Sequence, residues 1–223
     1  PNNLAKGNAM TLRSLLITLL AGIVSVAHAA AGDDLVRPIQ DQWAEIKYRQ
    51  AEKQQADLYR ELAVKAHKLA EANPNMAEPL IWEGIVISSE AGVRGALGGA
   101  LGLAKEARRL LEDSLKLDEK ALNGSAYTSL ATLYAKVPGW PIGFGDKKRA
   151  EELFKKSLAL NPAGIDPNFF YGEYLADQDR IAEARGYLEK ALKAPDRPGR
   201  ELADQGRRQE IQALLNKIGK DAR

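Results

Sequence analysis

The residues in this sequence best suited to binding are two aromatic side chains in a short stretch rich in glycine and proline. Trp140 and Phe144 lie in the segment VPGWPIGFGD (residues 137–146), together with two prolines and three glycines. A loop of this composition has a restricted backbone and can present aromatic rings to a partner. The rings could equally fold back over a neighbouring segment, because compact loops are often packed by their own side chains. The composition favours neither alternative over the other.

A second stretch, AGVRGALGGALGLA (residues 91–104), is rich in glycine and alanine and ends just before Lys105. Helix N-termini can bind phosphate, but this segment contains neither GxxxxGK[ST] nor GxGxxG, and no strand is expected before it. We therefore interpret its small residues as positions where a bent or broken helix packs closely against its neighbours. Arg94, within this stretch, is a candidate binding residue.

The sequence has no pattern typical of a catalytic or metal-binding centre. His67 lies among Lys65, Ala66 and Lys68, and we interpret this lone histidine as a surface residue. No cluster of histidine and carboxylate residues has the spacing of a metal site, and no nucleophile lies in a known catalytic motif. The sequence has no cysteine, so disulfides, thiolate chemistry and lipid attachment to cysteine are excluded. We expect neither enzyme activity nor a cofactor.

Residues 10–29 are predicted to be a secretory signal peptide. Arg13 supplies the positive charge, an apolar run covers residues 15–26, and Ala-His-Ala precedes a cleavage point after Ala29. Cleavage after Ala31 is the alternative. The apolar run is too short to favour a membrane-spanning helix.

The predicted mature chain has balanced charge. The sequence has 32 Lys and Arg against 30 Asp and Glu, and removal of Lys6 and Arg13 with the leader leaves 30 of each. A balanced surface argues against nucleic-acid binding, which needs a basic face. No later stretch is apolar enough to insert into a membrane. We expect a soluble periplasmic protein of undetermined oligomeric state, and we interpret residues 1–9, which precede Met10, as a cloning or translation artefact.

The elements that carry these residues are predicted to be paired helices, and residues 165–195 form the clearest pair. Asp166 followed by Pro167 is typical of a helix start, because the carboxylate can accept a free backbone N–H. Small residues at Gly172 and Ala184, twelve positions apart, would let two antiparallel helices approach closely.

This pair resembles the tetratricopeptide repeat (TPR), a helix-turn-helix unit of 34 residues. The resemblance rests on Gly172, Leu175, Ala184, Leu188, Ala191 and Pro195. It implies an all-α, TPR-like α-solenoid of about four helix pairs plus a C-terminal capping helix, all within a single domain at residues 30–223. The pairs would cover residues 33–76, 77–122, 123–164 and 165–198, and the capping helix residues 201–219. The resemblance is good over residues 77–195 and loose in the flanks.

The flanking segments allow less definite predictions. Residues 33–72 are predicted to form two helices with a break near residues 54–57, and one long helix is the alternative because neither glycine nor proline marks the break. In the capping helix, an apolar stripe would face the array, while Arg207, Arg208 and Lys217 are expected to face water.

The regular pair also reveals two insertions. The interval of twelve between its small residues becomes 23 between Gly84 and Ala107, and nineteen between Ala131 and Ala150. Eleven and seven residues are therefore inserted at the turn between the two helices of consecutive pairs. In a stacked array the two inserts should lie side by side on one edge, and loops on a rigid scaffold often carry binding residues.

In the TPR family the first helices of the pairs line a concave groove. The resemblance places on it Ile81, Ile85, Ser88, Ser89, Thr128, Thr132, Glu173 and Asp177. Such a groove would be apolar and rich in hydroxyl groups in the middle and acidic at one end. It would suit an extended peptide or a partner helix.

We therefore expect a periplasmic TPR scaffold that binds a protein or peptide partner through the groove or the two inserts. The alternative is a component that handles a small ligand. The chain also resembles the periplasmic T-component proteins of TRAP transporters, which carry a glycine-containing insert ahead of a second helix similar to GFGDKKRAEELFKKSLALNP. Those proteins are typically lipoproteins, whereas this sequence has no cysteine.

Overall fold

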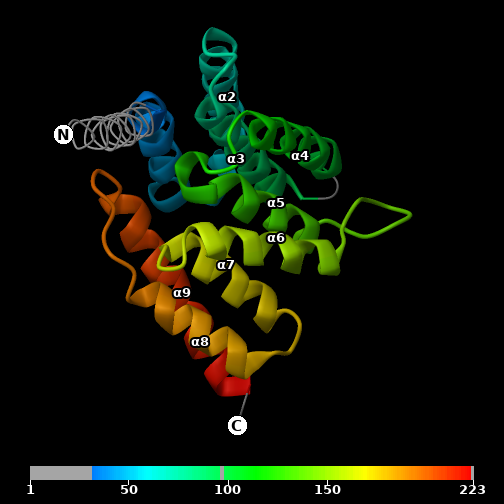
Figure 1. Ribbon diagram of the computed structural model, residues 1–223, viewed down its shortest axis with the longest axis vertical. Coiled ribbons are helices and arrows are strands. Elements are labelled where there is room, and N and C mark those ends of the chain that lie inside the picture. The colour runs from blue at the N-terminus through cyan, green and yellow to red at the C-terminus, as the bar shows by residue number, and fades with distance from the viewer. Residues whose placement is uncertain (1–31, 96–97, 222–223) are drawn as a thin grey trace, which may run out of the picture.

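The computed structural model describes residues 32–95 and 98–221, and this part of the chain is all-α, as predicted (Figure 1). A helix over residues 32–49 comes first. The helices that follow are α2 (Glu52–Ala72), α3 (Ala77–Arg94), α4 (Ala100–Leu117), the short 3-10 helix η2 (Ala121–Gly124), α5 (Ser125–Lys136), α6 (Lys147–Leu160), α7 (Ile165–Ala176), α8 (Ile181–Leu192) and α9 (Glu201–Asp221). None of these described helices is both long and apolar enough to cross a membrane. The predicted signal peptide and residues 1–9 lie outside the described residues.

Residues 32–72 form two helices, as predicted, but the break lies at residues 50–51 and not at residues 54–57. Ala51 has an extended backbone, with φ −61° and ψ 137°. The side-chain amide of Gln55 donates to the backbone oxygens of Gln50 (3.1 Å) and Lys47 (3.4 Å). Two carbonyl groups at the end of the first helix thus obtain a donor, which lets the chain turn without glycine or proline.

Small residues set the spacing within the helix pairs, as predicted. A Cβ atom on Gly172 would lie 2.9 Å from Cγ of Leu188 and 3.3 Å from the carbonyl oxygen of Ala184. Gly84 has the same relation to α4, where Leu111 Cγ and the Ala107 oxygen would lie at the same two distances. The helix pairs α3–α4 and α7–α8 therefore pack through the same contact, a glycine against a leucine and a backbone carbonyl group.

We expect Gly172→Ala to destabilise the protein by about 1–2 kcal/mol, because the added methyl group overpacks the contact with Leu188. Gly186→Ala is the matched control, since Gly186 is also inside a helix but has nothing within 4 Å of its added Cβ. Alanine there should stabilise by about 0.5–1 kcal/mol through helix propensity. Urea denaturation of both variants measures the difference, and two changes of the same sign would contradict this account.

The first insertion mainly lengthens helices. Helices α3 and α4 have 18 residues each, whereas α7 and α8 have 12. The two long helices are joined by residues 95–99, of which 96 and 97 lie outside the described residues. Buried Ala91 and Ala104 near the two helix ends help to explain why this segment is rich in small residues.

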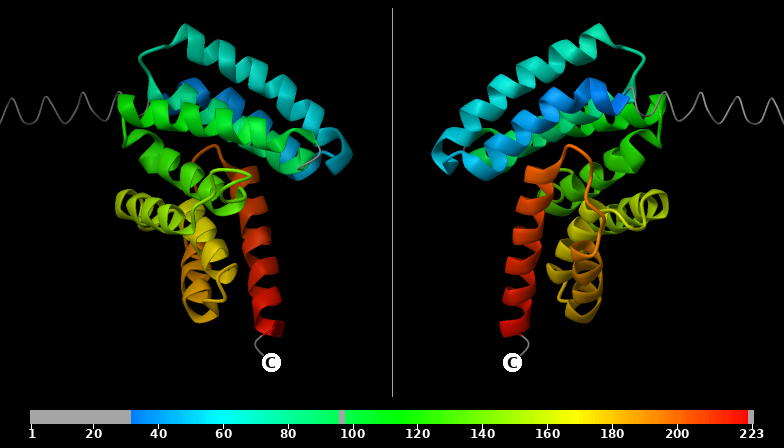
Figure 2. Two further views of the ribbon diagram at one scale, coloured as in Figure 1. Left: turned by 90° about the vertical axis from the view of Figure 1, so that its right-hand side faces the viewer. Right: turned by 90° about the vertical axis from the view of Figure 1, so that its left-hand side faces the viewer.

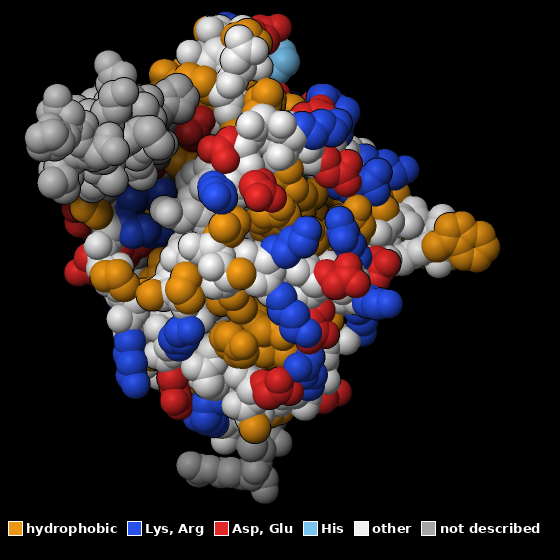
Figure 3. All heavy atoms as spheres, in the orientation of Figure 1, with side chains coloured by type: hydrophobic (Ala, Val, Ile, Leu, Met, Phe, Trp, Pro, Cys, Tyr) orange, Lys and Arg blue, Asp and Glu red, His pale blue; other side chains and the backbone are white. Residues whose placement is uncertain are grey.

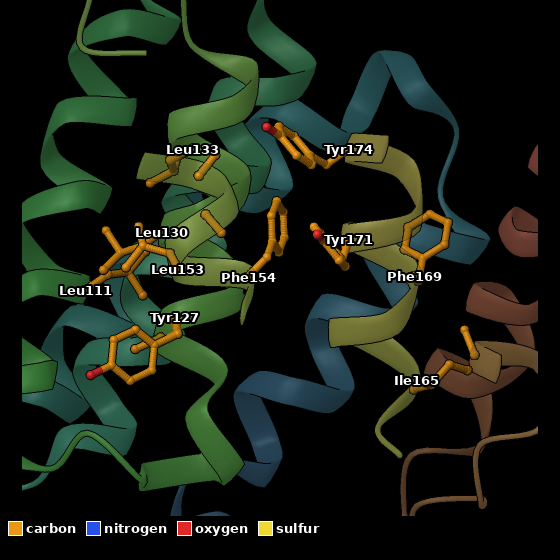
Figure 4. Packing of buried hydrophobic residues seen from close by; sticks show 14 of the residues in the cluster. Leu111, Tyr127, Leu130, Leu133, Leu153, Phe154, Ile165, Phe169, Tyr171 and Tyr174 are labelled. Atoms are coloured by element: carbon orange, nitrogen blue, oxygen red, sulfur yellow. The ribbon is translucent and has the colours of Figure 1, made fainter. Parts of the chain in front are cut away.

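The core divides into two hydrophobic clusters. The larger one runs from α3 to α9 and has Phe154 of α6 near its centre, next to Tyr171 and Tyr174 of α7 (Figure 4). The smaller one joins the first helix, α2 and α3 around Trp43 and Trp82. The last helix also contributes to the smaller cluster, because Ala203 is buried there.

The two ends of the helical array meet, so the arrangement is closed (Figures 1 and 2). Arg37 of the first helix donates to the carbonyl oxygen of Pro198 at 3.0 Å. Lys47 and Tyr48, also in the first helix, contact the carboxylate of Glu210 in α9 at 3.2 and 3.3 Å. The start of α9 therefore packs against the first helix as well as against α7 and α8.

Candidate functional site: a cleft between the helices

The closed array surrounds a cleft of about 1600 Å³. Its walls come mainly from the first helix, α3, α5, α7 and the start of α9, with smaller contributions from α2 and α4, and most of its lining is apolar. Residues of both insertions, including Leu101 and Ile142, line it as well. Helices that are far apart in the sequence thus share one interior surface.

Most of the predicted groove residues lie on this surface. Ile85, Ser88, Ser89, Thr128, Thr132 and Glu173 line the cleft. The prediction for Ile81 is wrong, because its side chain is fully buried in the larger core cluster and cannot contact a ligand. Asp177 is exposed outside the cleft lining, where its carboxylate binds Lys136 at 2.7 Å.

The hydroxyl groups in the cleft wall are bonded to the protein itself. Ser88 donates to the Gly84 oxygen at 2.7 Å, and Thr132 donates to the Thr128 oxygen at 2.9 Å. Ser89 donates to its own helix and accepts a hydrogen bond from Trp43 at 2.8 Å. These donors are therefore already satisfied, and the middle of the cleft behaves as a largely apolar surface.

The acidic end that the sequence predicted is partly neutralised. Lys136 lies between Glu173 (3.3 Å) and Asp177 (2.7 Å). The resemblance to the TPR family predicted the two carboxylates, but it gave no indication that a lysine from α5 would pair with them.

A cluster of arginines at the opposite end was not predicted. Arg207, expected to face water, is buried, and its Nε contacts Asp166 at 2.8 Å. Arg197 contacts the other oxygen of Asp166 at 2.7 Å and also pairs with Asp204. The guanidinium group of Arg207 also lies over the rings of Phe169 and Phe170, at 4.6 and 4.5 Å.

Asp166 joins this cluster instead of capping a helix. Helix α7 begins one residue earlier, at Ile165, and Gly164 is its N-cap. Burial opposes ionisation of Asp166, but Arg197 and Arg207 outweigh it and hold the pKa of this carboxyl well below its usual range. The partners lie 31 and 41 residues away in the sequence, so local spacing could not reveal them.

The projecting loop at residues 137–146 contains one displayed ring and one packed ring. The side chain of Trp140 is 91% exposed and that of Ile142 is 69% exposed. Phe144 instead makes an edge contact with Tyr134, with ring centres 5.5 Å apart, and Arg108 lies 4.5 Å above it. Both alternatives left open by the sequence therefore occur, one for each ring. Figure 3 shows hydrophobic side chains at the tip of this loop.

Backbone contacts hold the base of the loop. The backbone N–H of Gly145 donates to the Pro138 oxygen, and that of Asp146 donates to the Tyr134 oxygen, both at 2.9 Å. A Cβ atom on Gly145 would overlap the carbonyl group of Val137, so this position requires glycine. Asp146 then caps α6 by accepting from the Arg149 N–H at 3.0 Å.

The two insertions lie next to each other, as predicted. A Cβ atom on Gly143 would be 3.3 Å from Cδ1 of Leu101, and Arg108 of α4 lies over Phe144 of the loop. Arg94 takes no part in this contact. Its guanidinium group binds Glu90 at 2.6 Å and lies 4.0 Å from Asp57, outside the cleft lining.

His67 lies apart from the cleft and has a partner that the sequence did not reveal. Its Nδ1 lies 2.8 Å from the carboxylate of Glu83, which is buried, while the histidine itself is mostly exposed. This hydrogen bond raises the pKa of His67. Within residues 32–95 and 98–221 there is no group of three or more side chains that could hold a metal ion.

Comparison of the sequence with protein-family models and with curated proteins found no match.

Proposed function

We propose that this chain is a TPR-type binding protein that holds an elongated, largely apolar ligand inside the cleft. The observation that carries the proposal is the contact between α9 and the first helix, which gives the cleft walls from both ends of the array. A cleft with apolar walls on several sides suits a largely apolar ligand that lies between those walls.

The size of the cleft favours a long ligand. Small-molecule pockets commonly have volumes of roughly 300–1,000 Å³, and this cleft is larger, at about 1600 Å³. Its lining extends from the insertions to the arginine cluster around Asp166. A ligand with an extended apolar chain could therefore follow the length of the cleft.

The TPR assignment and the cellular location are parts of the same proposal. The repeated close contacts at Gly84 and Gly172 support a TPR-like array. The predicted signal peptide supports export to the periplasm, and N-terminal sequencing of the exported protein would test it. A ligand-handling role also agrees with the resemblance to TRAP T-component proteins.

The experiment is calorimetric titration of the full chain with dodecanol and dodecanoate, two probes with the same apolar chain, below their aggregation concentrations. We expect saturable binding to the wild type and to Val64→Trp, since Val64 is exposed on α2 and lies outside the cleft lining. Thr132→Trp should weaken binding strongly, because the indole adds bulk to the wall of the cleft. Circular dichroism checks that each variant is folded. No saturable binding of either probe, or equal binding by both variants, would contradict the proposal.

A second candidate function is docking of a protein partner on the loop at residues 137–146. The exposure of Trp140 and Ile142 side by side on a projecting loop favours it, because exposed apolar side chains rimmed by polar residues are typical of interaction sites. Crosslinking in intact periplasm followed by mass spectrometry should recover the partner from the wild type but not from Trp140→Ala. An unchanged crosslink in that variant would exclude this role for the loop.

A further inference from the structure

Three arginines lie where α9 begins, and one of them has no acidic partner. Arg197 pairs with Asp166 and Asp204, and Arg207 pairs with Asp166 and Glu210. Arg200 has no carboxylate within 4 Å among the side chains that the structure describes.

Arg200 is held in the wall of the cleft by an aromatic ring. Its guanidinium carbon lies 5.1 Å from the ring centre of Trp82, and both residues line the cleft. Stacking on tryptophan fixes the plane of the guanidinium group and leaves its N–H edges available to a ligand. A partly buried cation with no carboxylate in direct contact is costly, and an anion in the cleft would reduce this cost.

Buried polar atoms without partners belong to three further residues that line the same cleft. The indole Nε1 of Trp82, the hydroxyl of Tyr59 and the side-chain oxygen of Gln40 have no hydrogen-bond partner among the described residues. These side chains are 5%, 1% and 1% exposed and line the cleft. An unsatisfied buried donor costs about 1–3 kcal/mol. Trp82 and Tyr59 can both donate, and a small side-chain movement towards the cleft would let a ligand group that accepts hydrogen bonds satisfy them.

We propose that Arg200, with Trp82 beneath it, binds the carboxylate of the ligand at the α9 end of the cleft, while the apolar part of the ligand extends towards the insertions. This inference rests on the proposed function, because it assigns the polar end of the same ligand. A planar carboxylate matches the two parallel N–H groups of a guanidinium.

The surrounding charges favour a single negative charge on the ligand. Burial, followed by repulsion from Arg197, lowers the pKa of Arg200 to about 10, so it is cationic at neutral pH. The negative charges of Asp166, Asp204 and Asp33 raise the pKa of Arg200. These three aspartates would repel a doubly charged phosphate, whereas a carboxylate adds only one negative charge.

The test compares dodecanoate with dodecanol on the wild type and on Arg200→Gln. We expect Arg200→Gln to weaken dodecanoate binding by at least about tenfold, since a hydrogen bond to a charged group contributes roughly 1.5–3 kcal/mol. Dodecanol binding should change by less than about twofold. Arg185→Gln on α8 is the matched control, because Arg185 is exposed and outside the cleft lining, and it should leave both affinities unchanged.

Two conservative variants, which disturb the fold less, separate an effect on binding from an effect on folding. Arg200→Lys keeps the charge but loses the guanidinium plane, and it should bind dodecanoate with intermediate affinity. Trp82→Phe keeps a ring but removes the indole N–H, and it should weaken dodecanoate more than dodecanol. If both probes bind and Arg200→Gln affects them equally, the carboxylate site is wrong and the proposed function stands. If neither probe binds the wild type, the proposed function itself fails.

Discussion

Replacing Asp166 with alanine is expected to lower the free energy of unfolding by about 3 kcal/mol. The carboxylate pairs with Arg197 at 2.7 Å and with Arg207 at 2.8 Å, and the side chain of Arg207 is only 7% exposed. Removal of one partner from a buried ion pair typically costs about 3–5 kcal/mol. The lower end applies here because Arg197 keeps Asp204 and Arg207 keeps Glu210. Urea denaturation followed by circular dichroism measures the loss.

Asp113→Ala is the matched control for this prediction. Asp113 also contacts two basic side chains, Lys116 at 2.7 Å and Arg109 at 3.2 Å, but on the surface of α4. Surface ion pairs contribute about 0–1 kcal/mol. Equal losses in the two aspartate variants would show that burial of the arginine cluster does not matter for stability.

Asp166 should also make stability depend on acidity. Its pKa is lower in the folded protein than in the unfolded chain, so its contribution is fully present above the unfolded value of about 3.9 and is lost as the pH falls towards the folded pKa. Asp166→Asn removes this titration. Between about pH 5 and pH 2.5, wild-type stability should therefore fall more steeply than that of the variant.

Phe154→Ala is expected to cost about 3–5 kcal/mol, the range found for truncation of a buried aromatic side chain. The Phe154 ring is 1% exposed and lies 5.6 Å from the ring of Tyr171 and 5.5 Å from that of Tyr174 (Figure 4). It fills the space between the α5–α6 pair and α7, so alanine would leave a cavity between neighbouring pairs. The midpoint of urea denaturation should fall accordingly.

Leu117→Ala provides the comparison for this truncation. Leu117 ends α4 and is 43% exposed, so its loss should change stability by no more than about 0.5 kcal/mol. A cost at Phe154 as small as that at Leu117 would mean that the neighbouring pairs are not coupled through this ring.

The sequence was most informative where a contact depends on local spacing. Gly172 and Ala184 predicted the crossing of α7 and α8, and the same spacing logic located both insertions. It could not show that the first insertion would extend two helices, because a run of Ala, Leu and Gly is compatible with a helix or a loop.

The candidate site was less predictable because it depends on contacts between distant parts of the chain. The resemblance to the TPR family placed Ile85 and Thr132 on a groove, and both line the cleft. Arg207 was assigned to water because it lies on the polar side of an amphipathic helix. Only the closure of the array places Asp166 and two phenylalanine rings against that side. The helical periodicity of the sequence therefore could not predict the arginine cluster or the position of Arg200.

The contact between the first helix and α9 also determines the order in which the protein can fold. In an open array of repeats, each unit contacts only its neighbours, so folding can begin anywhere and propagate. Here Arg37 and Tyr48 contact residues 161 and 162 positions later in the chain. Contacts over such a distance carry a large entropic cost of loop closure and form slowly. Closure should therefore be the last event in folding, and no N-terminal fragment that lacks α9 can contain the complete cleft.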